Sequence, residues 1–575
     1  MPQGNSSGGA SPRSQNGRTS QAGNRCRPEI VLAYAITGFG IVVLSGLTTK
    51  VYNVPLSAQL GLFQLLPPAY WIGLSLIAAS TVISAWRGSD VLVAVTGIIL
   101  LATLAGTPSL FEPTPRYWDA YVHFAESQSF MVSGRLSSNP SSYSANWPGA
   151  FLVIWTVSAA SGVPSIEFLG LFPFLTGGLT FLAIFELVRS IFGPVVARQV
   201  SVPTALFAVW AQYHVSPQSL GFVLLLMVLA TCRRRETTWR LIAVTLFGGL
   251  VVSHPTSSIL LLSVLGLNAG LSSMPWFHGD VSREEARAEG RMSRRVAVTF
   301  AIVWLAWLFF LAVGSSEAAK FAVLTRMEDV LLVPEQTVNV ATHRTSESLL
   351  TWAPLIRFAS MGIYGLAGIV SLVALFRDRG SRDLFRLGLS ALIGPGLVAA
   401  ADIFGFGGQF YDRSLLLIAT FVPALCFAGL GKIRMPKGLR RGALVVLVCA
   451  SVATASTTYY LEAFNLVPVE SIAAANFSNT LPAGCVVMDG KFPVPVWIDP
   501  ARRSLIYHFD FSQVYPIPLS YVGGQVTTYA AYDPTAELWY RQWYGSEIWG
   551  FYSSEQANNS LIYDNGWTRI YAVSP

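Results

Sequence analysis

Long apolar stretches alternate with short polar connections from about residue 30 to residue 460. Each stretch runs for roughly 15 to 23 residues, the length that an α-helix needs to cross the hydrocarbon core of a membrane. Strands of a membrane barrel would instead alternate apolar and polar side chains. The pattern predicts a polytopic α-helical membrane protein with about 13 transmembrane helices. The expected spans are 30–49, 68–86, 91–109, 166–188, 199–213, 217–231, 241–253, 255–271, 296–315, 358–376, 387–401, 414–431 and 442–460.

Composition supports a membrane protein. Of the 575 residues, 52% are hydrophobic and only 12% are charged, about half the charge of a typical soluble domain. The mean hydropathy is +0.50. The five cysteines are scattered and show no metal-ligand spacing, so we expect neither a disulfide framework nor a cysteine-based metal site.

Composition also divides the chain into three parts. Residues 1–28 are rich in Ser, Gly, Asn and Arg, which predicts a disordered tail. No signal peptide precedes the first span, which can serve as its own insertion signal. Residues 29–460 form the expected membrane domain. In residues 461–575 the apolar runs shorten to strand length, which predicts a small α/β or mixed domain. Its expected strands are 485–488, 494–498, 504–508 and 568–572, with a tight turn at 564–566.

The distribution of basic residues predicts the orientation. If the amino terminus is cytoplasmic, the inner segments hold 25 of the 38 Lys and Arg residues but only about 8 of the 31 acids. This asymmetry follows the positive-inside rule and places residues 461–575 on the extracytoplasmic side of the cell membrane. The pI near 9.1 is explained by this topology, so we expect no nucleic-acid partner.

Three segments fit the pattern of spans less simply. Residues 149–162 are apolar enough to span, but the flanking Pro148 and Pro164 favour a helix lying on the membrane surface. The two short spans between 241 and 271 meet at 253–256 and predict a tight helical hairpin. Residues 272–295 mix both signs of charge, and we expect a solvated inner loop with one or two helical turns.

A polar loop between the third and fourth spans, within residues 110–165, carries the first candidate chemistry. Asp119, His123 and Glu126 fall within eight residues, at a spacing that puts them on one face of a short helix. We interpret this loop as an outer catalytic loop. The alternative is an ordinary interfacial loop whose charged residues only keep it hydrated. The aromatic residues that would let the helix lie on the membrane surface are Tyr117, Trp118, Tyr121 and Phe124.

Other functional residue types gather at the same expected face of the membrane. Taken singly, His214 or His254 could cap a helix, and Asp412 with Arg413 could be a simple charge pair. Their shared side favours a site, because ionisable groups near a membrane are costly to keep without a function. The further residues expected at the outer ends of the spans are Tyr213, His214, Gln218, His254, His343, Arg344, Asp402, Tyr411, Asp412 and Arg413.

These residues resemble a known family. The Trp118-Asp119-x-x-x-His123 pattern in the first large outer loop is similar to the GT-C superfamily of polytopic glycosyltransferases, and most similar to prokaryotic and archaeal proteins related to dolichyl-phosphate-mannose protein mannosyltransferases. Two features depart from the family: the acidic loop follows the third span instead of the first, and Asp119 has no adjacent acid. The other matching motifs are Asn146-Trp147-Pro148-Gly149, Phe192-Gly193, the segment from Tyr213 to Gln218, and the segment from Ile562 to Gly566.

The resemblance implies a GT-C-like fold and an inverting transfer of a sugar from a polyprenyl-phosphate donor to an extracytoplasmic glycan, lipid or protein acceptor at the membrane lipid surface. Asp119 would be the general base, with Glu126 as its rival. Arg413, Arg344 and His254 could stabilise the leaving phosphate. The need for a divalent cation stays open. The remaining substrate-binding candidates are His123, Tyr213, His214, Gln218, Tyr411 and Asp412.

Three other classes compete with this interpretation. A polysaccharide polymerase or ligase would also use lipid-linked sugars and outer Arg and His residues. A transporter or flippase should place ionisable groups at mid-membrane depth and often shows an internal repeat. Only Glu167 and Glu186 lie inside apolar runs, both near the ends, and no repeat is evident. A purely structural membrane protein would leave the loop acids and outer histidines unexplained.

Overall fold

The structure is a computed structural model. His343 and Arg344, the tail up to residue 26 and the strand expected at 494–498 lie outside the residues that it describes. The described residues are 27–134, 142–234, 236–277, 283–317, 320, 352–405, 410–478, 480–482, 485–489, 505–508, 527–544 and 546–573.

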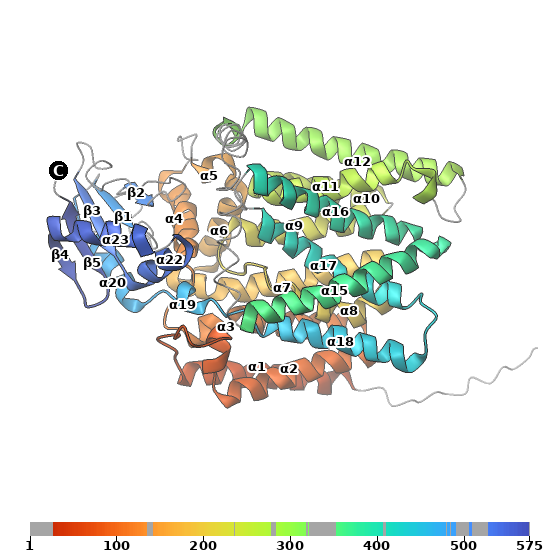
Figure 1. Cartoon of the computed structure of the whole chain (residues 1–575), viewed down its shortest axis with the longest axis horizontal. Coiled ribbons are helices and arrows are strands. Elements are labelled where there is room, and N and C mark those ends of the chain that lie inside the picture. The colour runs from red at the N-terminus through yellow and green to blue at the C-terminus, as the bar shows by residue number, and fades with distance from the viewer. Residues whose placement is uncertain are drawn as a thin grey trace, which may run out of the picture.

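A bundle of apolar helices makes up most of the molecule (Figure 1). Each expected span corresponds to a helix, and nine helices in the described part are long and apolar enough to cross a membrane. The chain is therefore a multi-pass membrane protein. The helices are α1 (Pro28–Thr48), α2 (Pro68–Arg87), α3 (Asp90–Phe111), α7 (Ser165–Phe192), α8 (Pro194–Phe207), α9 (Pro217–Cys232), α10 (Thr237–Ser253), α11 (Pro255–Leu271), α12 (Arg283–Phe310), α15 (Trp352–Arg377), α16 (Arg382–Gly405), α17 (Tyr411–Leu430) and α18 (Lys437–Ala455).

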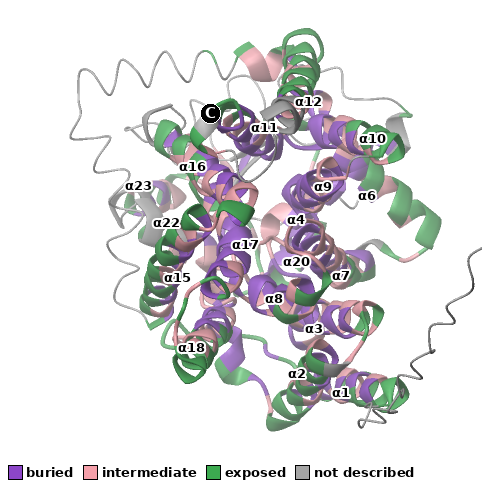
Figure 2. Ribbon diagram, turned by 90° about the vertical axis from the view of Figure 1, so that its right-hand side faces the viewer, coloured by how far each residue is buried: buried purple, intermediate pink, exposed green. Residues whose placement is uncertain are grey.

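The bundle has a clear centre and periphery, as the end-on view in Figure 2 shows. Within the most apolar stretch of 18 residues of each helix, 72% is buried inside the protein in α17 but only 11% in α12. Close packing between helices depends on small residues, as is usual in membranes. On α7, a Cβ added to Gly177 would lie only 2.7 Å from Ala105 Cβ and 2.8 Å from the Leu101 carbonyl oxygen of α3. Glycine at this position lets α3 and α7 approach closely.

The helix α8 ends at Phe207, six residues before the expected end of its span at 213. Residues 208–216 leave the helix, and Ser216 is extended with φ −158° and ψ 152°. This conformation suits a residue that precedes a proline, here Pro217. The expected boundary is wrong, and His214 lies in the segment that has left the helix.

The charged segment 272–295 is more helical than expected. A short 3₁₀ turn covers Pro275–Phe277, and α12 already begins at Arg283 and continues without a break into its apolar part. Arg, Glu and Ala are good helix formers, so the charged residues extend the span instead of forming a loop. The expected hairpin is confirmed, because only His254 separates α10 from α11.

The described residues of the catalytic loop expected at 110–165 form three helices: α4 (Trp118–Ser133), α5 (Tyr143–Asn146) and α6 (Pro148–Ser161). Tyr121 and Phe124 on α4 are fully buried, and they pack with Phe168 and Val467 in one apolar cluster. The aromatic side of α4 therefore contacts protein, and the expectation that it lies on the membrane surface is wrong. Helix α6 exists as expected, and its surface location stays a prediction.

A small mixed sheet follows the last span, as expected, and lies at the same end of the bundle as α4 (Figure 1). The strand order is β2-β1-β3-β5-β4, with β1 parallel to both of its neighbours and β5 antiparallel to both of its own. The turn at 564–566 is confirmed: Gly566 has φ +83° and donates its N–H to Asp564 Oδ1 at 2.8 Å. The elements are α19 (Glu462–Asn465), α20 (Val469–Ser478), β1 (Val486–Asp489), β2 (Leu505–His508), β3 (Thr528–Tyr532), α22 (Pro534–Tyr544), α23 (Ser546–Glu555), β4 (Ser560–Asp564) and β5 (Arg569–Val573).

Candidate active site

Asp119 lies in the first turn of α4, directly after an unusual backbone position. Tyr117, which precedes the helix, has φ +69° and ψ 114°, a region that side chains other than glycine rarely adopt. The Tyr117 N–H donates to the carbonyl oxygen of Asn465 at 2.9 Å. The side chain of Asp119 is 31% exposed. The carboxyl side chain is thus held at a helix start and stays partly exposed.

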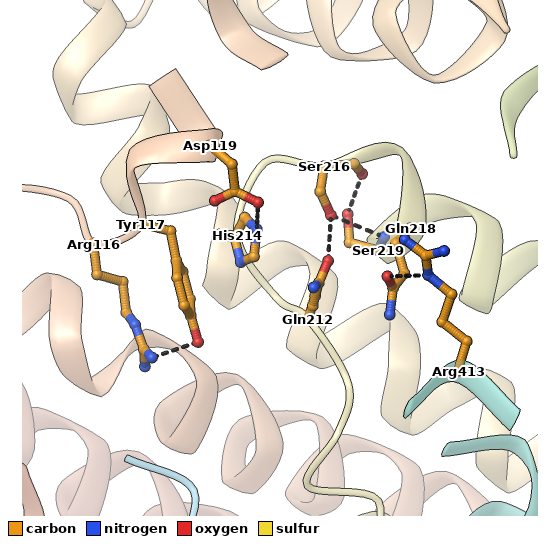
Figure 3. A network of polar contacts seen from close by, with 9 residues as sticks. All are labelled: Arg116, Tyr117, Asp119, Gln212, His214, Ser216, Gln218, Ser219 and Arg413. Atoms are coloured by element: carbon orange, nitrogen blue, oxygen red, sulfur yellow. Dashed lines mark hydrogen bonds and ion pairs between the residues drawn. The ribbon is translucent and has the colours of Figure 1, made fainter. Parts of the chain in front are cut away.

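His214 is the direct partner of Asp119 (Figure 3). Its Nε2 lies 3.2 Å from Asp119 Oδ2, and the imidazole is only 4% exposed. The ring of Tyr117 packs on the imidazole with centroids 4.1 Å apart. The orientation of Asp119 therefore depends on a histidine that is itself held by an aromatic ring.

His123 lies one turn after Asp119 on α4. Burial lowers the pKa of His123 to about 4, Asp119 acts to raise that pKa, and His214 acts to lower it. His123 is consequently neutral near pH 7. Its Nδ1 is buried and has no hydrogen-bond partner among the residues that the structure describes.

Arg413 on α17 is tethered by two side chains from other helices. Its Nε donates to Gln218 Oε1 at 2.9 Å, and its Nη1 donates to Thr256 Oγ1 at 3.2 Å. Figure 3 shows Gln218 and Arg413 on the far side of His214 from Tyr117. Because two of the three nitrogens are already engaged, the guanidinium is fixed in place and Nη2 is the nitrogen best placed to serve a further anion.

His254 has a structural role that its sequence position already suggested. Its Nδ1 accepts the N–H of Ser257 at 3.2 Å, and this hydrogen bond caps α11. The same nitrogen lies 2.8 Å from the Ser257 hydroxyl. The imidazole interacts electrostatically with Arg413 and His123. Gly221 on α9 packs against it, since an added Cβ there would lie 2.7 Å from His254 Cβ. His254 therefore both caps a helix and borders the site.

Glu126, the rival base, lies on α4 two turns beyond Asp119, about 10 Å further along the helix axis. Tyr143 on α5 interacts electrostatically with both Glu126 and Arg413. Glu126 thus belongs to the same polar region as Asp119, at a different depth along α4.

The other expected site residues are placed differently. The Tyr213 carbonyl accepts the Thr176 hydroxyl at 2.5 Å, and its side chain packs on the bundle core. The Tyr411 N–H donates to Asp402 Oδ2 at 3.1 Å. Asp412 interacts electrostatically with Arg357 of α15. These residues border the same end of the bundle.

Sequence reasoning missed a buried cluster beside Tyr117. Arg116 forms an ion pair with Glu462 of α19, with Nη2 to Oε2 at 3.0 Å and exposed fractions of 7% and 0%. Burial and the adjacent Glu462 charge raise the pKa of Glu112 well above its usual range. Arg116 stood in the predicted loop, but nothing local to it pointed to a partner near the other end of the chain.

Arg357 was also missed. It directly precedes the expected span 358–376. Its Nε donates to Thr457 Oγ1 at 2.7 Å and its Nη2 to the Thr457 carbonyl oxygen at 2.8 Å. Its guanidinium also lies 4.6 Å from the ring centroid of Tyr460.

Within the described part of the chain, no group of three or more His, Cys, Asp or Glu residues is arranged to hold a metal ion. Asp119, His123 and His214 interact with one another, but they do not form such a group.

Fold and site together define a multi-pass membrane protein with a polar site at the end of the bundle that carries its small sheet domain. The crystal structure of an Archaeoglobus fulgidus oligosaccharyltransferase in complex with Zn and sulfate is similar over 84% of this chain and 73% of its own, with 14% identity and a TM-score of 0.51. The expected GT-C-like fold is therefore confirmed.

A second similar structure is that of ArnT from Cupriavidus metallidurans bound to undecaprenyl phosphate. The similarity extends over 85% of this chain and 98% of the ArnT chain, with 11% identity and a TM-score of 0.47. No family model matches the sequence, and no curated protein matches it.

Proposed function

We propose that this protein is a membrane glycosyltransferase that moves a sugar from a polyprenyl-phosphate donor to an extracytoplasmic acceptor, with inversion at the anomeric carbon. The observation that carries the proposal is the placement of Asp119. Its side chain is partly exposed, bonded to a buried histidine, and carried by a loop helix at the end of the bundle. A tethered arginine lies in the same region.

Asp119 is the proposed general base. As the acceptor oxygen attacks the anomeric carbon, Asp119 takes the hydroxyl proton and the bond from that carbon to the phosphate oxygen breaks. The electron pair of that bond leaves with the polyprenyl phosphate. His214 keeps Oδ2 of Asp119 oriented. His123, neutral because of burial, adds no positive charge that would lower the basicity of Asp119.

Arg413 is the proposed partner of the donor phosphate. Gln218 and Thr256 fix its guanidinium before the donor arrives, so little reorganisation is needed when charge develops on the leaving group. Because those two contacts occupy Nε and Nη1, we expect Nη2 to contact the phosphate. Arg344 keeps its proposed role only as a sequence expectation.

The proposed acceptor group is a hydroxyl of a glycan, a lipid or a protein. The proposal does not specify which sugar the donor carries. We place the site on the extracytoplasmic side, because the distribution of Lys and Arg favours a cytoplasmic amino terminus. Glu126 is the alternative base, and its interaction with Tyr143 keeps it in the same polar region.

The test uses membranes that contain the protein, with radiolabelled undecaprenyl-phosphate-linked mannose, glucose and galactose as separate donors. We expect one donor to lose its label to an acceptor fraction while free undecaprenyl phosphate accumulates. Label that crosses the membrane on the intact lipid would indicate a flippase. A parallel assay supplies undecaprenyl-diphosphate-linked glycans, and transfer only from those donors would indicate a polymerase or ligase. Either result would contradict the proposal.

A further inference from the structure

The segment from Tyr459 to Val467, which joins the last span to the sheet domain, crosses the loop that leads into α4. We call residues 459–467 the strap. The Asn465 carbonyl of the strap accepts the Tyr117 N–H at 2.9 Å, and the Val467 carbonyl accepts the Thr114 hydroxyl. The Tyr459 hydroxyl donates to the Leu104 carbonyl of α3. The strap therefore holds the residues immediately before the proposed base.

The centre of this contact is the buried ion pair between Arg116 and Glu462. Two buried charges lose their hydration, and apolar side chains of similar volume often stabilise a fold as well or better. Stability alone is thus a weak reason for placing this pair at the base of α4. A functional reason is suggested by what the arginine touches.

Arg116 holds the ring of Tyr117. Its guanidinium carbon lies 4.0 Å from the Tyr117 ring centroid and 4.8 Å from that of Tyr459, and its Nη2 donates to the Tyr117 hydroxyl. Backbone conformations such as that of Tyr117 are strained and persist where the surroundings enforce them. The ring of Tyr117 also contacts the imidazole of His214, and the two ring centroids are 4.1 Å apart.

We propose that Glu462 is a positioning residue for Asp119, acting through Arg116, Tyr117 and His214. The contacts run continuously from the strap to the carboxylate, and Figure 3 shows the part from Arg116 to Asp119. Docking of the strap thereby sets the orientation of the base. The inference rests on the proposed function, because it gives Asp119 the role of general base.

Loss of the Glu462 charge should free Arg116 from its anchor and let the strained Tyr117 relax, which would move His214 and tilt Asp119. Misplacement of a reacting group by about 1 Å can cost roughly 10²-fold in rate. We therefore expect Glu462→Gln to lower kcat by about 10-fold to 100-fold. The KM for the donor should stay unchanged, because Arg413, the proposed partner of the donor phosphate, is held by Gln218 and Thr256.

The matched control is Glu537→Gln. Glu537 on α22 also pairs with an arginine, Arg541, at 2.6 Å, but Arg541 is exposed and Glu537 is partly exposed in the sheet domain. We expect wild-type kcat from this variant. Both variants are assayed with the undecaprenyl-phosphate sugar that the donor panel selects, and their melting temperatures are measured in detergent. Equal kcat for Glu462→Gln and wild type would overturn the inference.

A double variant separates positioning from stability. Arg116→Met with Glu462→Leu removes both buried charges, so it should recover much of the stability that Glu462→Gln alone loses. If the pair only stabilises the fold, kcat will recover together with the melting temperature, and the inference is wrong. If the pair positions Asp119, the melting temperature will recover while kcat stays low.

A series at Tyr117 gives a second test that leaves the ion pair intact. Tyr117→Phe keeps the ring that contacts His214, whereas Tyr117→Leu removes it. We expect the Phe variant to retain clearly more kcat than the Leu variant. Equal loss in both would contradict the inference.

Failure of this inference and failure of the proposed function give different results. Wild-type transfer by both Asp119→Asn and Glu126→Gln would refute the proposed function. An inactive Asp119→Asn variant, together with wild-type kcat in both Glu462→Gln and Tyr117→Leu, would leave the proposed function standing and overturn the role of the strap.

Discussion

Asp119 and His123 stand one helical turn apart on α4, yet their surroundings give them different roles. Asp119 is partly exposed and bonded to His214, which suits an ionised base. Burial holds the pKa of His123 at about 4, which keeps its imidazole neutral. The sequence predicted that the two side chains share a helix face. It could not predict their protonation, because burial depends on residues from other helices.

His123 should make the stability of the protein depend on pH. An unfolded histidine takes up a proton below its ordinary pKa of 6.5, whereas folded His123 does so only near 4. Its contribution is therefore fully present above pH 6.5 and is lost as the pH falls from 6.5 towards 4. We expect the melting temperature of His123→Asn in detergent to fall less between pH 7.5 and pH 5 than that of wild type. Equal falls would contradict a buried neutral imidazole.

Arg413 is expected to bind the donor phosphate in a way that lysine cannot reproduce. An ammonium group cannot contact Gln218, Thr256 and a phosphate with the geometry of the planar guanidinium. A hydrogen bond to a charged group contributes about 1.5–3 kcal/mol, so Arg413→Lys should weaken undecaprenyl phosphate binding by about 10-fold to 100-fold.

Native mass spectrometry with undecaprenyl phosphate measures this binding. Arg569→Lys is the control, because Arg569 is an exposed residue of the sheet domain. Equal affinity in Arg413→Lys and wild type would remove Arg413 from the phosphate site.

At the scale of elements, helix ends build the site. The early end of α8 frees the segment that carries His214, and Ser216 caps α9 by accepting the Ser219 N–H at 3.2 Å. His254 caps α11 in the same way. Span positions were predictable because apolar length is a local property. The end of α8 was misplaced because the residues after Phe207 are still apolar enough to continue a span.

The cap on α11 gives a prediction at this scale. Loss of an N-cap side chain costs about 0.5–2 kcal/mol. His254→Ala should therefore lower the melting temperature in detergent, whereas His254→Asn, which keeps a capping acceptor, should lower it less. Equal melting temperatures for the two variants would show that the cap is unimportant. Reduced affinity of His254→Asn for undecaprenyl phosphate would support the phosphate role expected from the sequence.

At the scale of the whole molecule, contacts between distant parts of the chain set the site. The loop acids and outer histidines were found from their spacing and expected side. The ion pair of Arg116 and Glu462 was not, since no local pattern links the first loop to the segment after the last span. The expected division at residue 460 stays a proposal, and the strap shows that the two parts contact each other closely.

Orientation in the membrane is the prediction that belongs to this scale. Cys485 is only 3% exposed and is unsuited to labelling, so single cysteines are placed in a cysteine-free background. An impermeant maleimide added to sealed cells should label Ser554→Cys on α23 and should not label Ser273→Cys after α11, both of which are exposed positions. The reverse pattern would overturn the proposed topology.

The most direct test of the central claim compares Asp119→Asn with wild type in sugar transfer. The amide keeps the volume of the carboxylate and a contact for His214 but cannot accept the proton, so kcat should fall by roughly 10²–10⁴-fold, while undecaprenyl phosphate binding and melting temperature should change little. Glu126→Gln is the matched comparison on the same helix, and a larger loss there would move the role to Glu126. Transfer at the wild-type rate in both variants would contradict the proposed mechanism.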